Sequence, residues 1–390
     1  MKKIGERVYY FGLADKDRKI FDQLVPLLQG TTYNSYAIRG DEKCALVDTM
    51  YSKFEGQYVD MIAASGLKFD YIISNHAEPD HSGAMNSVLK MFPEAVVLCS
   101  QKCSQNLQNM VGVDAGRIRV VGDGEELDLG GVTLKFLMTP WVHWPDTMFT
   151  YYVEEKMLFS CDFFGAHFTN FELFADDSAE LAESAKRYYS EIMMPFANFC
   201  RKYLKLAEEL APSMILPSHG AVYANPKFIL NLYREWTSPD PTQKVLIGYI
   251  SMYENTKLMS EYLGSAMRAL GLEAKLVDLM ETDEGELAMD LIDASALVIG
   301  VSMVLAGPHP RAVYAAYLAS LLRPKLKFYS VIGSFGWGGN LTGAIESNLN
   351  IPGIEKIEPV IAKGRPLPGD FAALDALAQT LKQKLSGPNK

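Results

Sequence analysis

Residues 70–83 read DYIISNHAEPDHSG, a short apolar strand that runs directly into a loop crowded with metal-binding side chains. Within six positions the loop supplies two imidazoles and two carboxylates, from His76, Glu78, Asp80 and His81. An extended segment would place residues 76, 78 and 80 on one side, so that three ligands converge without contortion of the backbone. Such a density of His, Glu and Asp at a strand end is typical of a metal site.

Three further candidate ligands also follow predicted strands. These are His143, Asp162 and His219, and each of them taken alone is more often a structural residue. Together with the loop they complete the order H-x-E-x-D-H, then H, D and H, which predicts that strand ends bring seven ligands to one place. His167 follows Asp162 by five residues; it is a candidate proton donor near that carboxylate, although a structural histidine is the commoner role.

The two halves of the chain follow different patterns. Up to about residue 235, short strands with hairpin turns favour an antiparallel or mixed sheet with helices outside. From residue 244 onward, five strand–helix units specify an open parallel sheet with helices on both faces. The segment 236–243 (WTSPDPTQ) has two prolines and small polar residues and is interpreted as a linker. We therefore expect two α/β domains, at residues 1–240 and 244–390.

Three loops after strands of the second half form a candidate site for a cofactor that carries a phosphate group. The loop 251–256 places hydroxyls and backbone N–H groups at a helix N-terminus, which suits a phosphate, and it lacks the Walker motif and its lysine. The loops 302–307 (SMVLAG) and 333–339 (GSFGWGG) follow two other strands, and the latter combines close backbone approach with two aromatic rings. The candidate cofactor-binding residues are Ser251, Met252, Tyr253, Glu254, Asn255, Thr256, Ser302, Met303, Val304, Leu305, Ser334, Phe335, Gly336, Trp337, Gly338 and Gly339.

Composition excludes several classes of protein. With 37 Lys and Arg against 47 Asp and Glu, the formal charge of the 390-residue chain is −10, so we expect no nucleic-acid or membrane partner. The five cysteines form no CxxC pair, which argues against a disulfide framework and an in-chain iron–sulfur or rubredoxin-type site. The apolar stretch 296–307 is too short to span a bilayer, and no signal-peptide pattern is seen. A cytoplasmic protein is expected.

The ligand order and the three loops together resemble those of the flavodiiron proteins. This resemblance spans nearly all of the chain, and all seven metal-ligand positions are filled. It implies a metallo-β-lactamase-like αββα domain with a non-haem diiron site, followed by a flavodoxin-like doubly wound domain that binds FMN. One iron would take His76, Glu78 and His143, the other Asp80, His81 and His219, with Asp162 bridging the pair. Zinc hydrolases of this fold have histidine in the place of Glu78, and a carboxylate there favours iron.

The resemblance also implies an activity. The protein would reduce O₂ to water, NO to N₂O, or both, with electrons passed through FMN from a rubredoxin-like protein or, less commonly, from a reduced deazaflavin. A head-to-tail homodimer, or a dimer of such dimers, would set the FMN of one subunit against the diiron site of the other. A zinc hydrolase with an attached flavodoxin domain and a flavin-based O₂ or NO sensor are the alternatives. The preference between the two gases stays open.

One loop departs from the pattern of that family. Its members usually carry Ser-Pro-Thr and then a polar residue where this chain has Ser302-Met303-Val304-Leu305-Ala306. A side-chain hydroxyl and an amide are thus lost, and backbone groups would have to hold the flavin there.

Overall fold

The computed structural model describes residues 1–239 and 242–387, and the chain divides into two units, Met1–Thr237 and Ser238–Lys390. The predicted linker 236–243 spans this division, and its residues 240 and 241 lie outside the described part. No helix among the described residues is long and apolar enough to cross a membrane.

The first unit is built on two mixed sheets. The larger has the order β1-β2-β7-β8-β9-β10-β11, and the smaller β12-β13-β14-β15-β16. Their bounds are β1 Lys2–Lys3, β2 Val8–Tyr10, β7 Tyr36–Arg39, β8 Cys44–Val47, β9 Tyr71–Ile73, β10 Val96–Cys99, β11 Ile118–Val120, β12 Glu126–Asp128, β13 Thr133–Met138, β14 Met148–Tyr152, β15 Met157–Cys161 and β16 Met214–Pro217. Two small ladders, β3 Leu13–Asp15 with β6 Thr31–Tyr33 and β4 Ile20–Phe21 with β5 Val25–Pro26, complete the strands of this unit.

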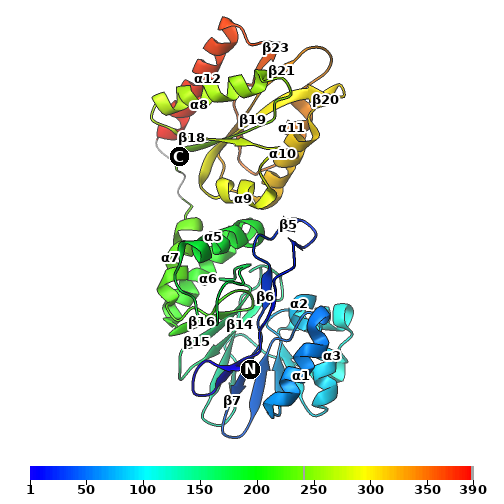
Figure 1. Ribbon diagram of the computed structural model, residues 1–390. Helices are drawn as coiled ribbons and strands as arrows, with labels where there is room; N and C mark the ends of the chain where they lie inside the picture. The colour runs from blue at the N-terminus through cyan, green and yellow to red at the C-terminus, as the bar shows by residue number, and fades with distance from the viewer. Residues whose placement is uncertain (240–241, 388–390) are drawn as a thin grey trace. The chain divides into compact units, whose positions relative to one another are not determined.

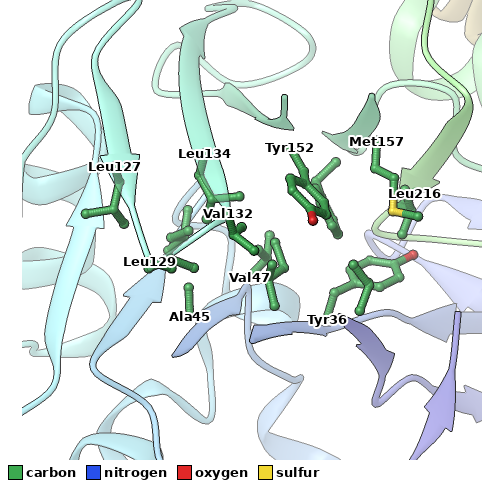
Figure 2. Close-up of a cluster of buried hydrophobic side chains, with 14 of the residues drawn as sticks. Tyr36, Ala45, Val47, Leu127, Leu129, Val132, Leu134, Tyr152, Met157 and Leu216 are labelled. Carbon is green, nitrogen blue, oxygen red and sulfur yellow. The ribbon is translucent and has the colours of Figure 1, made fainter. Parts of the chain in front are cut away.

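The core of the first unit lies between these two sheets. Figure 2 shows Tyr36 and Val47 of the larger sheet pointing toward Leu134, Tyr152 and Leu216 of the smaller one, and all of these side chains are buried. Residues of β14 and β15 are buried on both faces, because helices cover the outer side of their sheet. Burial of alternating side chains on the inner faces is what makes two such sheets pack as a sandwich.

Helices flank this sandwich on both outer sides (Figure 1). One group comprises α1 Glu55–Ser65, α2 Pro79–Ser82, α3 Met85–Met91 and α4 Gln101–Asn106, and the other α5 Ala179–Tyr188, α6 Ala197–Leu210 and α7 Pro226–Trp236. The second group packs through aromatic rings: Phe149 of β14 contacts Tyr203 of α6, with ring centroids 6.4 Å apart. The arrangement is the αββα sandwich that the family resemblance implied.

The second unit contains the predicted parallel sheet. Its strand order is β18-β17-β19-β21, and both β22 and β23 pair with β21 in parallel. The strands are β17 Lys244–Tyr249, β18 Glu273–Asp278, β19 Ala294–Val304, β20 Gly307–Pro308, β21 Phe328–Phe335, β22 Glu355–Lys356 and β23 Val360–Lys363. The helices are α8 Asn255–Ala269, α9 Glu284–Asp293, α10 Pro310–Leu322, α11 Gly343–Asn348 and α12 Pro368–Ser386. Helices α8 and α12 cover one face of the sheet, and α9, α10 and α11 cover the other (Figure 1). A parallel sheet with helices on both faces is doubly wound.

Candidate metal centre and flavin pocket

The seven predicted ligands come together in the first unit, and they form two groups. In one group, Oε2 of Glu78 lies 3.3 Å from Nε2 of His76 and 3.2 Å from Nε2 of His143. In the other, Oδ2 of Asp80 lies 3.4 Å from Nε2 of His81 and 3.3 Å from Nε2 of His219. The family resemblance assigns these same two sets of three residues to separate metal ions.

Asp162 joins the two groups through different oxygens. Its Oδ2 lies 3.1 Å from Nε2 of His76 and 3.1 Å from Nε2 of His143. Its Oδ1 lies 3.1 Å from Nε2 of His81 and 3.6 Å from Nε2 of His219. A carboxylate placed in this way has one oxygen available to each of two ions.

Strand ends deliver these side chains, with one correction to the sequence prediction. Strand β9 ends at Ile73, but the loop after it does not stay extended, because Pro79 begins the helical turn α2. Proline suits the first position of a helix, where no backbone N–H is needed. Asp80 and His81 therefore project from a helical turn, and residues 76, 78 and 80 do not share one side of an extended strand.

The centre is buried, and three of its carboxylate oxygens have no hydrogen-bond partner among the described residues. His76, His81, His219 and Asp162 are at most 1% exposed. Both oxygens of Asp80 and Oδ1 of Asp162 are buried and have no hydrogen-bond partner among the described residues. Because an unpaired buried carboxylate is costly, it requires a cation nearby. Four imidazoles and three carboxylates form a mixed nitrogen and oxygen donor set that suits iron.

The charges of the centre also affect its titration. Burial raises the pKa of Glu78 and of Asp162, but the neighbouring imidazoles outweigh it and hold both pKa values below the usual range. Burial lowers the pKa of His81 and of His143, and here the carboxylates prevail, raising them to about 8 and about 9. Without a metal ion, His81 and His143 are therefore imidazolium ions at neutral pH, beside the ionised carboxylates of Glu78 and Asp162.

Removal of metal with a chelator is expected to make stability depend on pH. The folded pKa values of His81 and His143 exceed the value of about 6.5 for an unfolded histidine. Both imidazolium ions therefore stabilise the metal-free fold fully below pH 6.5, and this contribution is lost as the pH rises through about 8 and 9. The melting temperature of the chelated protein should fall by at least about 4 °C over this range. Metal-loaded protein should show no such fall; identical profiles for both forms would refute the expectation.

Several neighbours of the centre escaped sequence analysis. The ring of Phe21 lies 4.4 Å from that of His167 and 5.6 Å from that of His219. Next to it, Asp22 is exposed on the surface, and partial desolvation followed by the carboxylates of Glu78 and Asp80 raises its pKa to about 6. Phe21 ends β4 and Asp22 follows it in the turn to β5, so this hairpin brings both residues to the site. No motif marks them, because only the tertiary fold places them there.

His167 is buried beside the centre without joining it. Its Nδ1 lies 2.9 Å from Oγ1 of Thr31, whereas its Nε2 has no hydrogen-bond partner among the described residues. The ring also contacts Tyr188 at 4.8 Å and lines a cavity of about 100 Å³. Burial, and after it His219, holds the pKa of His167 well below its usual range, so the imidazole is neutral. Its role as a proton donor stays a prediction.

In the second unit, a cavity of about 400 Å³ lies at the carboxyl ends of β17, β19 and β21, and all three predicted loops line it. The hydroxyls of Ser251 and Ser302 are buried there and have no hydrogen-bond partner among the described residues. Helix α8 begins at Asn255 on the same wall. Unpaired hydroxyls beside a helix N-terminus suit a phosphate group, so these residues fit the phosphate of FMN.

The lining differs from the predicted set in a few positions. The predicted residues Glu254, Gly338 and Gly339 do not line the cavity, whereas Ala306 and Gly364 do. Gly364 directly follows β23, so the carboxyl end of this further parallel strand was the signal that sequence analysis overlooked.

The atypical second loop is the tip of a β-hairpin. Strand β20 pairs antiparallel with the end of β19, and Leu305 and Ala306 form the two-residue turn with φ angles of 50° and 64°. Positive φ at both central residues is the geometry of a tight hairpin turn. Three large side chains at the cavity are exposed: Leu305 at 94%, Tyr253 at 82% and Trp337 at 71%. The cavity therefore has an apolar rim. A buried core position for Trp337 is thereby excluded.

Comparisons with known proteins identify the family of this chain. The family described as "ODP family beta lactamase" matches residues 31–220. The chain is 33% identical over 364 residues to a nitric oxide reductase of Moorella thermoacetica, covering 91% of this chain and 90% of that one. This chain belongs to the flavodiiron protein family.

Solved structures of flavodiiron proteins extend over both units. Rubredoxin oxygen:oxidoreductase of Desulfovibrio gigas is 29% identical with a TM-score of 0.91 over 98% of both chains. The flavodiiron protein of Giardia intestinalis is 25% identical with a TM-score of 0.87, covering 99% of this chain and 98% of that one. The predicted family and the fold class of both halves are confirmed, and the protein is an oxidoreductase; neither the hydrolase nor the sensor finds support among these relatives.

Proposed function

We propose that this flavodiiron protein reduces O₂ to water, NO to N₂O, or both, at two irons held by the seven clustered side chains. The observation that carries the proposal is Asp162, whose two oxygens face different groups of ligands. His76, Glu78 and His143 would hold one ion, and Asp80, His81 and His219 the other. The relatives support this choice of gases: the Moorella protein is named for nitric oxide and the Desulfovibrio protein for oxygen.

The two cofactors would supply the electrons. Two irons and one FMN together can store four electrons, the number that reduction of one O₂ to two waters requires, whereas joining two NO molecules requires two. The chain's own contribution is to hold the ligands in place and to exclude bulk water, since His76, His81 and Asp162 are at most 1% exposed. A low-dielectric site of this kind fixes its charges more strongly than water does.

Electrons are proposed to come from a small rubredoxin-like protein. The name of the Desulfovibrio relative supports this donor. We also propose that the protein works in the cytoplasm, where its five cysteines, all free and buried, would remain reduced.

Gas electrodes test the proposed activity directly. Protein supplied with reduced rubredoxin should consume O₂ or NO continuously, and the two initial rates decide the preferred gas. Protein reconstituted with zinc in place of iron serves as the control, because zinc has no redox chemistry and should leave only background consumption. Equal rates for the zinc and iron forms would contradict a reaction at the diiron centre.

The phosphate of FMN is proposed to bind at the loop 251–256, where Ser251 offers an unpaired hydroxyl. Replacing Ser251 with alanine removes a hydroxyl that has no partner in the protein. A hydrogen bond to a charged group contributes about 1.5–3 kcal/mol, so FMN should bind about 10- to 100-fold more weakly, as measured by fluorescence titration of flavin-free protein. The control is Ser265→Ala, because that hydroxyl donates to Glu261 within α8. Wild-type affinity in Ser251→Ala would place the phosphate elsewhere.

A head-to-tail homodimer, or a dimer of such dimers, is proposed as the working form. Support comes from large apolar side chains that are exposed at both sites: Leu305 and Trp337 on the flavin pocket and Trp141 beside the loop of His143. A self-complementary interface would cover them twice. Upon dilution, O₂ or NO turnover should fall as dimers dissociate, while reduction of FMN by an external donor continues. Undiminished turnover in chains shown by sedimentation to be monomers would refute the dimer.

A further inference from the structure

Cys161 lies directly behind one of the proposed metal ligands. It is the last residue of β15, and its Sγ is 3.1 Å from Nδ1 of His76. Both side chains are buried, with exposures of 1% and 0%. None of the five cysteines was expected to contribute to the metal centre, and the other four have no contact of this kind with a proposed ligand among the described residues.

The direction of this hydrogen bond follows from the other ring nitrogen. Nε2 of His76 faces Asp162 and Glu78, at 3.1 and 3.3 Å. An imidazole that offers the lone pair of Nε2 to a metal ion carries its proton on Nδ1. The Nδ1–H group of His76 therefore donates, and the sulfur of Cys161 accepts.

We propose that Cys161 is a positioning residue of the diiron centre, whose sulfur fixes the ring of His76 with Nε2 toward the metal. This inference rests on the proposed function, because it assumes that His76 binds a metal ion. Partners of this kind orient ligating histidines, and their loss typically costs about 10–100-fold in metal affinity or activity.

The backbone holds the sulfur in this position. The pairing of β15 with β16 changes register between Phe159 and Cys161, and Cys161 has a φ of 54°. Its carbonyl accepts a hydrogen bond of 2.8 Å from the N–H of Ser218. A positive φ is unfavourable for a residue with a Cβ atom, so strand pairing maintains a conformation that turns the side chain of Cys161 toward His76.

The two halves of the centre differ in these outer partners. Nδ1 of His219 lies 2.5 Å from the carbonyl oxygen of Thr32 and 3.3 Å from Oγ1 of Thr31. His76 has a thiol instead, and sulfur is a weaker acceptor than a carbonyl oxygen. Because Cys161 contacts His76, whereas Thr31 and Thr32 contact His219, a change at Cys161 should affect the ion of His76 and leave the ion of His219 unchanged.

Release of iron to a chelator, followed in the intact holoprotein, tests the inference. In Cys161→Ala one of the two irons should leave about 10-fold faster than in the wild type, and only one of the two iron signals in the Mössbauer spectrum should change. Cys161→Ser keeps an acceptor on a shorter bond and should fall between the two. The control is Cys200→Ala, whose buried thiol donates to the carbonyl of Met193 in the same unit, and it should match the wild type.

Each outcome decides the inference. Wild-type release rates and spectra in Cys161→Ala would overturn it, as would equal acceleration of both irons or equal effects of Cys200→Ala. If Cys161→Ala fails to fold, Cys161→Ser provides the measurement, and in that variant unchanged release and an unchanged spectrum refute the inference. A wild-type protein that binds zinc would refute the proposed function. The inference about Cys161 would then be tested on zinc: faster release of only one of the two zinc ions in Cys161→Ala would support it, and unchanged release would refute it.

Discussion

Replacing Asp162 with asparagine is expected to abolish turnover and to release both metal ions while FMN stays bound. Oδ1 and Oδ2 of Asp162 face separate groups of ligands, and a neutral amide cannot provide two anionic oxygens. Loss of an outer partner already costs about 10–100-fold, so loss of the shared ligand should leave less than about 1% of the activity. Elemental analysis and gas consumption measure the two effects.

Asp15→Asn provides the matched control for that variant. Asp15 is also a buried carboxylate, with 4% exposure, but it pairs with Lys53 and is not among the proposed ligands. It should retain iron and turnover. Normal metal content and gas consumption in Asp162→Asn would show that this carboxylate does not bridge two ions.

Replacing Glu78 with histidine is expected to shift the centre toward zinc and to end gas reduction. The variant would have five imidazoles and two carboxylates, and nitrogen-rich sites suit zinc better than iron. Zinc content should rise toward two ions per chain, turnover should drop below about 1%, and the FMN content should stay at the wild-type level because the flavin pocket is in the other unit.

The control adds an imidazole away from the centre. Glu94 is exposed on the loop before β10, so Glu94→His should change neither the metal content nor turnover. O₂ consumption at the wild-type rate by an iron-depleted Glu78→His protein would refute the role assigned to Glu78.

Residue patterns predicted the parallel sheet and the strand ends that carry candidate ligands, whereas the grouping of those ligands came from the family resemblance. The period of strands and helices after residue 244 specified the parallel sheet, and parallel strands bring their carboxyl ends to one edge. Asp162 and His219 also lie together because β15 and β16 run parallel, a pairing that the sequence pattern of the first half did not predict. In such cases local sequence decides which residues end a strand, and the order and direction of the strands decide which of these ends lie together.

The remaining features depend on contacts that no local pattern encodes. The helical turn at Pro79 was misjudged as extended, although proline at the start of a short helix was available as a signal. The position of Asp22 near the carboxylates of the metal centre depends on where the two-stranded ladder of β4 and β5 packs. The orientation of Cys161 depends on a register shift between paired strands. Each of these is set by tertiary structure, which sequence spacing alone does not determine.

Metal and flavin analysis of the purified protein tests the central claim most directly. The ligands around Asp162 are proposed to hold two irons, and the cavity beside Ser251 is proposed to hold FMN. Protein from cells grown with both iron and zinc available should be yellow and contain two irons and one FMN per chain. Two zinc ions and no iron under the same conditions would contradict the account.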